Sequence, residues 1–539
     1  MSEQAAASLW ERSSIVRFFR WLFSWRGISR IVILLLWIVT IVALFYGEEN
    51  WRGRRTWNKM RREIEARGEK LDFKAFIPPP VADEQNFAAT PFIRSWFDRG
   101  IQANQLWGDD YSRAESKVTA FKQKGDRGTR HFRDLVAWAA AFNSLKSGQT
   151  NDQQKFDSAE RDRESREKAA PAVLEGFKSS ESRLSELRTA SARPYSHYPI
   201  VYKMEDPWGI LLPHLARVKS ACQRLQIKAC AELASARSDA AFKDVTLMLY
   251  LADSVKEEST LISYLVRVAC VRIAAQPVWE GLAEHRWSEA QLRDLQSRFT
   301  RYDFLRDIEH PLHSERAAGI LTADLLHRGK YRLTNLQTEY TDEAFFGGNN
   351  IFGGEILNLI GRAAPHGWYY REQVNYCRLY DGQFRGTYDI SSRRVFPRVI
   401  QANDKELERV IAGGRSGKMF NAIVHHHVIA AMLIPALERV PIRAATGQTE
   451  ADEAALACAL ERYRMAHGEF PENLDALVPQ LMPKLPTDLF SGQPYKYERT
   501  SKDHFLLYSI GANERDDGGE PGATLVDDRQ GDWVWEYPK

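Results

Sequence analysis

The sequence IVILLLWIVTIVALFYG at residues 31–47 decides how this chain of 539 residues is organised. The run carries no charge, and as a helix it extends about 25 Å. That length approaches the hydrocarbon thickness of a bilayer and predicts one transmembrane helix. The alternatives are a cleaved signal peptide and a buried core helix. Glu48 and Glu49 follow in place of a small-residue cleavage site, and the run has no polar face, so we expect a retained signal-anchor that contacts the lipid bilayer through residues 31–47.

Residues 1–30 form a basic amphipathic segment in front of this anchor. Arginines alternate there with bulky apolar side chains, which is typical of a helix in the headgroup layer of a membrane. The far flank, residues 51–62, is also basic. Counting basic residues therefore does not decide which side of the membrane the body occupies.

The composition excludes several classes of protein. Lys and Arg number 74 against 71 Asp and Glu, a net charge of +3, so we expect no nucleic-acid partner. The apolar fraction of 44% excludes both a polytopic membrane protein and a wholly disordered chain. The five cysteines include no CxxC pair, which indicates neither a disulfide framework nor a structural zinc site.

Hydrophobic periodicity predicts a mainly α-helical fold for the body. Apolar residues recur every three or four positions from Leu211 to Ala236, and Ser288 with Gln291 has the spacing of a capping box. We divide the body into a juxtamembrane helical region with a proline-rich strap (48–145), a charged helix or linker (146–205), a helical array (206–328), an irregular region rich in glycine and aromatic residues (329–400), a helix (401–448) and a small α+β domain (449–539).

The small C-terminal domain has the clearest pattern of elements. The segment EADEAALACALERYRMAHG (450–468) predicts a helix that stops at Gly468, whose missing Cβ suits a left-handed cap. Two alternating runs, residues 494–499 and 504–511, predict an antiparallel hairpin.

In this order, the helix, HGEFPENLDALV (467–478), LPTDLFSGQPYKY (485–497) and FLLYSIGANERDDGG (505–519) resemble the globular part of type IV pilin-like proteins, especially the major pseudopilin of type II secretion. Similar tails occur on membrane-anchored proteins of planctomycete and verrucomicrobial bacteria, whose early segment also resembles residues 51–80 here. The resemblance covers roughly residues 450–520.

The resemblance implies a pilin-like module on the outer side of the inner membrane. We therefore expect a single-pass inner-membrane protein with its short N-terminus in the cytoplasm and its large body in the periplasm. In pilin-like proteins, however, the apolar helix contains a Glu and leads directly into the globular domain. Here the apolar run has no Glu and ends at Gly47, far from Glu450, so we expect neither pilin processing nor polymerisation.

The resemblance also implies a calcium site, because the major pseudopilins bind Ca²⁺ in the loop after the last strand. The matching loop here is residues 510–519, and the ligand candidates are Asp516, Asp517, Asp527 and Asp528. The alternative is an ordinary solvated turn, which an Asp-Asp-Gly sequence also favours. We expect no other cofactor.

No catalytic motif is evident, and we expect no catalytic residues. The consecutive imidazoles His425, His426 and His427 point about 100° apart on a helix and form a poor ligand set. We expect a cell-envelope protein that acts by binding protein partners or by assembly, with a link to a secretion-like or pilin-like system. The alternative is an envelope hydrolase with a pocket in the aromatic and histidine region, where His425 or His426 pairs with Glu257 or Glu258.

Overall fold

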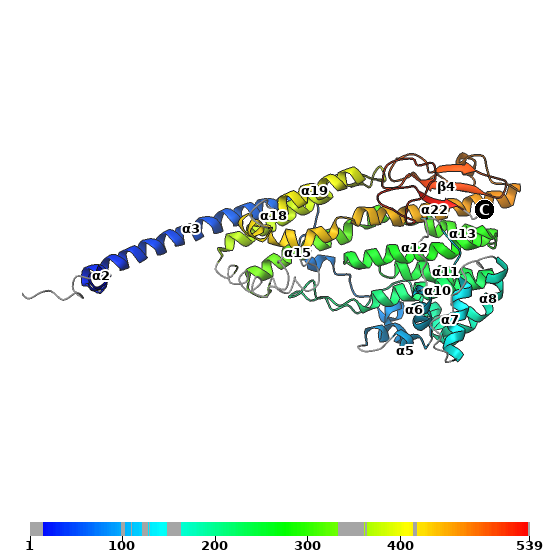
Figure 1. The fold of residues 1–539 in the computed structure, drawn as a ribbon, viewed down its shortest axis with the longest axis horizontal. Coiled ribbons are helices and arrows are strands. Elements are labelled where there is room, and N and C mark those ends of the chain that lie inside the picture. The colour runs from blue at the N-terminus through cyan, green and yellow to red at the C-terminus, as the bar shows by residue number, and fades with distance from the viewer. Residues whose placement is uncertain are drawn as a thin grey trace, which may run out of the picture.

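One long helix, α3 (Trp25–Ala66), contains the apolar run and joins it to the body. The computed structural model describes residues 14–98, 103–108, 110–120, 128, 130–147, 163–332, 361, 364–412 and 418–536. Helix α3 projects from one end of an elongated helical body (Figure 1). Its most apolar stretch has a mean hydropathy of 2.7 and is 0% buried. The expected N-terminal apolar helix is thus confirmed, and it is long and apolar enough to be compatible with a transmembrane or signal-anchor helix.

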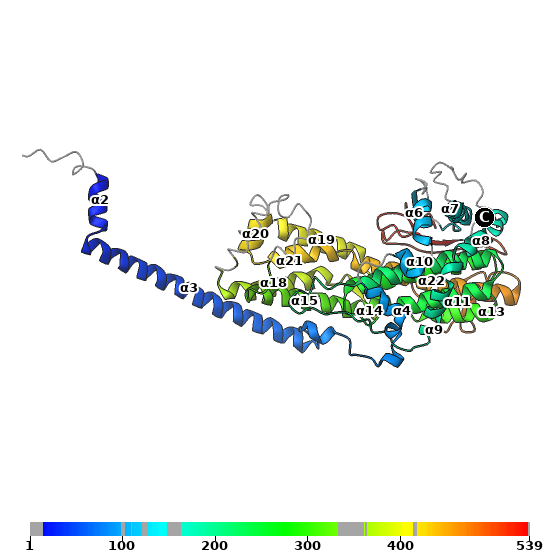
Figure 2. The same ribbon diagram turned by 90° about the horizontal axis from the view of Figure 1, so that it is seen from below.

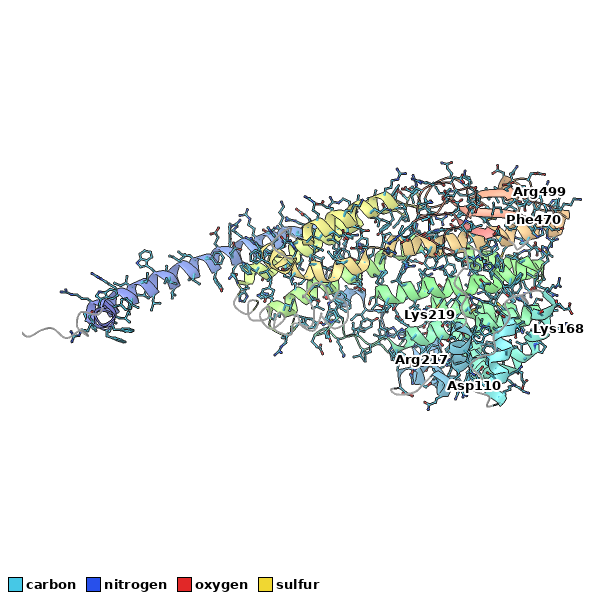
Figure 3. All side chains as sticks on the ribbon, in the orientation of Figure 1. Asp110, Lys168, Arg217, Lys219, Phe470 and Arg499 are labelled. Atoms are coloured by element: carbon cyan, nitrogen blue, oxygen red, sulfur yellow. The ribbon has the colours of Figure 1, made fainter. Side chains whose placement is uncertain are left out.

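A second helix of sufficient length and apolarity, α12 (Leu261–Ala283), is 67% buried in the body and is a core helix. In front of α3, helix α2 (Ser14–Leu22) turns across the axis of α3 (Figure 2). Its aromatic side chains Phe18, Phe19 and Trp21 are exposed. Side chains of the projecting half of α3 likewise point away from the body (Figure 3).

The second half of α3 packs against α18 (His366–Phe384). The two backbones are so close that a Cβ on Gly53 would lie 2.4 Å from the carbonyl oxygen of Gly367. Asn50 Oδ1 accepts the Gly367 N–H at 2.7 Å, and Arg371 pairs with Glu49 at 2.9 Å. These contacts fix the direction in which α3 leaves the body.

The strap that follows α3 lies on the body. Its short helix η1 (Phe73–Phe76) buries Phe73 and Phe76 against α15 (Glu309–His327). Further short elements follow along the chain: η2 (Asp83–Gln85), η3 (Phe87–Ala89), α4 (Pro91–Arg94), η4 (Ser95–Phe97), α5 (Ala103–Trp107), α6 (Tyr111–Ala120) and α7 (Leu135–Ser147).

The helical array expected over residues 206–328 is present. Ser288 caps α13 together with Gln291 in the predicted capping box. The array and the helices that lead into it are α8 (Arg163–Gly176), η5 (Lys178–Ser180), α9 (Glu181–Ala190), α10 (Pro213–Ala234), α11 (Ser238–Asp253), α12, α13 (Glu289–Thr300), α14 (Phe304–Asp307) and α15.

Helix α22 (Val440–His467) lies between this array and a small antiparallel sheet (Figure 1). Every residue of it from Ala444 to Glu461 is buried, as expected of a helix enclosed by other layers. It ends at Gly468, which has φ 84°, as predicted. The 3-10 helix η8 (Leu474–Leu477) leads to the sheet, whose strands pair in the order β3 (Lys496–Arg499), β4 (Phe505–Ser509) and β5 (Trp533–Glu536).

The predicted hairpin is therefore confirmed, with Lys496 opposite Tyr508 and Arg499 opposite Phe505. Polar contacts tie the sheet to the array: Trp279 Nε1 of α12 donates to the Glu536 carbonyl at 2.8 Å. Arg130 lies over the ring of Trp535 at 4.6 Å.

Two regions differ from the sequence expectation. Residues 366–384, expected to be irregular, form α18, because Val374, Cys377 and Tyr380 recur at helical spacing on its buried face. The rest of the expected irregular region lies largely outside the described residues. In place of one helix over 401–448, the chain forms most of α19 (Pro397–Ala412), then α20 (Lys418–Val424), α21 (Val428–Leu433), η7 (Ile434–Leu437) and the first turns of α22. The short strands β1 (Tyr388–Asp389) and β2 (Arg394–Val395) lie between α18 and α19.

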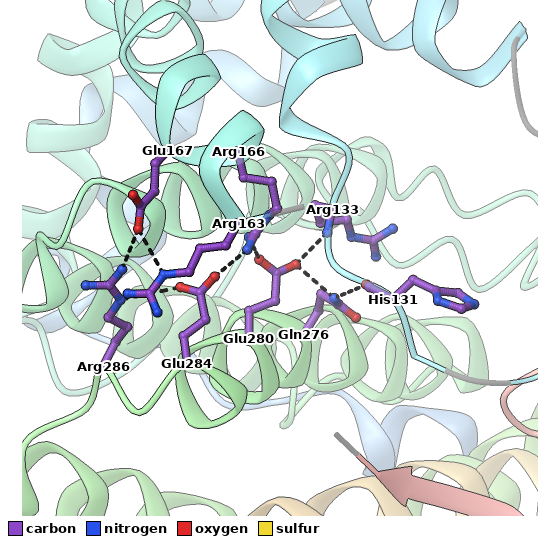
Figure 4. Close-up of polar contacts among 9 residues, drawn as sticks. All are labelled: His131, Arg133, Arg163, Arg166, Glu167, Gln276, Glu280, Glu284 and Arg286. Atoms are coloured by element: carbon purple, nitrogen blue, oxygen red, sulfur yellow. Dashed lines mark hydrogen bonds and ion pairs between the residues drawn. The ribbon is translucent and has the colours of Figure 1, made fainter. Parts of the chain in front are cut away.

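A buried ion network joins α8 to α12 (Figure 4). Arg166 pairs with Glu280 at 2.5 Å and with Glu284 at 2.6 Å, and its side chain is 2% exposed. Glu280 also accepts the Arg133 N–H at 2.7 Å, and Gln276 bridges Glu280 and the His131 carbonyl. Because every carboxylate in the network has a donor, this cluster holds the two helices together and leaves little capacity for a ligand.

We expect Arg166→Met to destabilise the fold by about 3–5 kcal/mol, because the buried carboxylates of Glu280 and Glu284 would lose their cation. Denaturant unfolding of the purified chain, followed by tryptophan fluorescence, measures the effect. The matched control is Arg163→Met on the same helix, whose side chain is 61% exposed and should change stability little. Equal losses in the two variants would contradict this account.

We expect Gly53→Ala to weaken the packing of α3 on α18, at a cost of about 1–3 kcal/mol, because the new methyl overlaps the Gly367 backbone. Thermal unfolding in a mild detergent measures the change. Gly47→Ala is the control, since a Cβ there meets nothing within 4 Å. The interpretation fails when both variants unfold at the temperature of the parent.

Candidate functional site

An apolar groove lies where α15, the first turn of α12 and the segment 207–212 meet. The groove encloses about 220 Å³. Its apolar walls come from Phe73 of η1, Pro207, Trp208, Ile210, Leu212, Leu261, Leu265, Ala318, Leu433 and Leu437. The walls come from η1, α12, α15, α21, η7 and the non-helical segment 207–212, all of which pack on the body, so the groove belongs to the folded body.

The rim of the groove exposes further apolar side chains. Ile262, which lines it, is 52% exposed, and Leu211, between the lining residues Ile210 and Leu212, is 63% exposed. The exposed Ile262 and the apolar walls beside it form a surface that favours a partner, because contact removes them from water.

The groove contains one carboxyl group, that of Glu315 on α15. Its Oε1 accepts the backbone N–H of Leu261 at 3.1 Å. Leu261 is the first residue of α12, and helix-terminal N–H groups lack an intrahelical acceptor, so this hydrogen bond fixes the carboxyl at the helix end. Burial raises the pKa of Glu315 to about 7, and the Leu261 N–H opposes that rise in part.

The next residues on the groove wall are polar but neutral. Thr260 caps α12 by accepting the Ser263 N–H at 3.3 Å, and Ser314 is buried beside Glu315. The arrangement can therefore accept hydrogen bonds or a positive charge at one point within an otherwise apolar surface.

The sequence analysis did not identify Glu315. A signal was present, because Glu315 stands at helical spacing between Leu312 and Ala318, both of which are buried. A charged residue within an apolar helix face indicates a paired or functional group. Its partner Leu261 is 54 residues away in the sequence and could not be deduced from it.

The structure pairs Glu258 with His214 and not with His425 or His426. His214 Nε2 lies 2.8 Å from Glu258 Oε1, and Ser263 donates to the other oxygen of that carboxylate. The imidazole stacks between Tyr198 and Phe97 and is completely buried. Neither His214 nor Glu258 lines the groove, so this pair fixes the core and is not open to a substrate.

The histidine triplet lies in the turn between α20 and α21 and not on a helix. His425 is exposed, and His427 is buried with Nε2 3.2 Å from Asn421 Nδ2. The His426 ring lies 5.0 Å from that of Trp368. Burial, and then the Arg371 cation, lower the pKa of His426 to about 4. No carboxylate among the described residues pairs with these imidazoles.

The four calcium candidates have separate partners. Asp516 pairs with Lys496 at 2.8 Å and Asp528 with Arg439 at 2.9 Å. Asp517 accepts from the Asn513 side chain, and Asp527 accepts the backbone N–H of Arg529 at 2.8 Å. Within the described part of the chain, no three His, Cys, Asp or Glu side chains are grouped to hold a metal. The calcium site stays a prediction.

The loop is instead organised by a carboxylate that sequence reasoning did not select. Asp532 is buried and accepts the N–H groups of Asp517 at 3.1 Å and Gly519 at 2.7 Å. Burial raises its pKa. The position of Asp532 next to β5 was the available signal, since a charged residue directly before a buried strand needs donors nearby.

We expect the stability contributed by Glu315 to depend on pH. With a pKa of about 7 in the fold and an ordinary value of 4.5, the folded state retains a proton that the unfolded chain loses, so stability falls as the pH rises from about 4.5 to 7. Glu315→Gln mimics the protonated form. Its melting temperature should match the parent near pH 5 and exceed it by several degrees at pH 8.

The control for this measurement is Glu84→Gln, because Glu84 is exposed in η2. The melting temperature of Glu84→Gln should equal that of the parent at pH 5 and at pH 8. A Glu315→Gln variant that loses stability between pH 5 and pH 8 in parallel with the parent would contradict the assignment.

Comparison with protein-family models, with curated proteins and with solved structures finds no match to this chain. The resemblance of residues 450–520 to pseudopilins is therefore carried by its sequence motifs alone. What the protein does has to be argued from the anchor-like helix and from the geometry of the groove.

Proposed function

We propose that this chain is a single-pass, membrane-tethered protein of the cell envelope that acts by binding a protein partner in the apolar groove. The observation that carries the proposal is the groove itself, which is lined almost entirely by apolar side chains and includes Ile262, 52% exposed. A partner that covers the groove would remove this contiguous apolar surface from water.

The volume of the groove favours a protein partner over a metabolite. Small-molecule sites usually enclose about 300–1,000 Å³, whereas the groove encloses about 220 Å³. That space suits one or two side chains, and protein interfaces concentrate binding energy in a few such anchors. The groove also contains no imidazole, which supports binding over the hydrolase alternative.

The tether is the projecting half of α3, whose apolar surface is unburied. We infer that residues 31–47 cross the inner membrane and that the body is periplasmic, as the pseudopilin-like segments imply. The three-stranded sheet, whose central strand β4 packs on α22, supports a helix-plus-sheet module of that general kind. A role beside a secretion-like or pilin-like assembly follows from the same resemblance.

Membrane attachment can be tested by deleting residues 31–47. We expect the parent chain to stay in the membrane pellet after alkaline carbonate washing, and the deletion variant to appear in the soluble fraction, because the body buries its own core. A protease added to spheroplasts should cut the parent body only when that body lies outside the inner membrane. Release of the parent by carbonate would contradict the tether.

Binding at the groove can be tested by placing a photo-crosslinking residue at position 262 of the full chain in native cells. We expect one discrete adduct, and we expect Ala318→Leu, which fills the groove from its wall, to abolish it while the melting temperature stays within a few degrees of the parent. A crosslinker at Arg293, whose side chain is 68% exposed, is the control and should not form this adduct. An adduct that survives Ala318→Leu would contradict groove binding.

A further inference from the structure

We propose that the groove receives a basic anchor, the lysine or arginine side chain of a partner protein, with Glu315 as its counter-ion. This inference rests on the proposed function, since it specifies the chemistry of the partner that the groove binds. The proposal follows from the position of one carboxyl group, that of Glu315, within the otherwise apolar groove.

The carboxyl group is positioned and only partly satisfied. The Leu261 N–H holds Oε1 at 3.1 Å, and Oε2 has no hydrogen-bond donor among the described residues. No described cation pairs with Glu315. Arg316, its neighbour on α15, is turned away and pairs with Asp381 at 2.9 Å and with Glu69. Oε2 is not among the buried side-chain atoms without a partner, so in the free groove it is open to water. A partner that covers the groove removes that water, which favours a ligand that brings its own donor.

Other elements packed around Glu315 supply no competing charge to the groove. α18 contributes Tyr376 and Tyr380, and the Tyr376 hydroxyl donates to the Glu315 backbone carbonyl at 3.3 Å and not to its carboxyl. Tyr380 donates to the Leu312 carbonyl at 2.7 Å. The lining residues from α12, from the segment 207–212 and from η7 are uncharged. A positive charge to pair with the Glu315 carboxylate therefore has to come from a partner.

The shape of the groove fits a basic side chain better than other donors. Lysine and arginine bury an aliphatic stem along apolar surface while their charged end reaches a polar partner. Leu265, Leu433 and Leu437 would contact such a stem, and Glu315 would meet its end. A purely aliphatic anchor would leave Oε2 without a donor, and an acidic anchor would be repelled.

Binding of this kind is linked to pH. The cation binds the ionised carboxylate of Glu315. Because burial raises the pKa of this group to about 7, the carboxyl is protonated below pH 7 and has to lose its proton before the cation can bind. We expect affinity to be constant well above pH 7 and to fall about tenfold per pH unit below pH 7. The cation itself stays charged throughout this range.

The test uses n-butylammonium as a probe for a lysine side chain, with n-butanol as its neutral analogue and butanoate as its anionic analogue. The full chain is reconstituted in nanodiscs, and empty nanodiscs serve as the blank. Ligand-observed NMR titrations at pH 6 and pH 8 give the dissociation constants. We expect the ammonium to bind about tenfold more tightly than the alcohol at pH 8, and this preference to disappear in Glu315→Gln.

Two controls separate this inference from the proposed function. Glu84→Gln should retain the preference for the ammonium, and Ala318→Leu should abolish binding of every probe. Equal affinity for ammonium and alcohol, lost in Ala318→Leu, would overturn the basic anchor while leaving apolar docking in place. Ammonium binding that survives Glu315→Gln, or no probe binding to the parent at pH 8, would also overturn the basic anchor. Loss of the crosslinked adduct from position 262 concerns the proposed function alone.

Discussion

The close contact between α3 and α18 is the constraint on which the rest of the architecture depends. Gly53 and Gly367 let the two backbones approach, and the hydrogen bond from Gly367 N–H to Asn50 then sets the register between the helices. Without this contact, the apolar half of α3 would have no fixed orientation relative to the body. With it, the surface that carries the groove has a fixed direction relative to the projecting helix.

The groove shows how helix packing creates a polar point in an apolar wall. α12 begins where α15 passes, so the unsatisfied N–H at the start of one helix finds a carboxyl group on the other. The same carboxyl then faces a cavity lined by residues from five parts of the chain. The interaction that completes the end of α12 is thus also the one that holds the single carboxyl group of the groove in place.

Local signals in the sequence predicted the local structure well. The apolar run, the capping box at Ser288 and the left-handed cap at Gly468 were recognised because each depends on neighbouring residues. The single helix expected over 401–448 was wrong partly because Pro441 lies within it: this proline occupies the first turn of α22, where its missing N–H costs nothing. The juxtamembrane helix merged with the anchor because no breaking residue separates them. The groove could not be predicted, since Phe73, Leu265, Glu315 and Leu433 meet only through tertiary packing.

The continuity of α3 also fixes how the body would stand on a membrane. Helix α3 spans about 63 Å over 42 residues, and its contacts with α18 begin at Glu49, two positions after the apolar run ends at Gly47. If residues 31–47 cross a bilayer as proposed, no free segment separates the body from the lipid headgroups. The body would then tilt together with the spanning helix as one rigid unit. Under the proposed function, a partner would have to present its side chain close to the lipid surface.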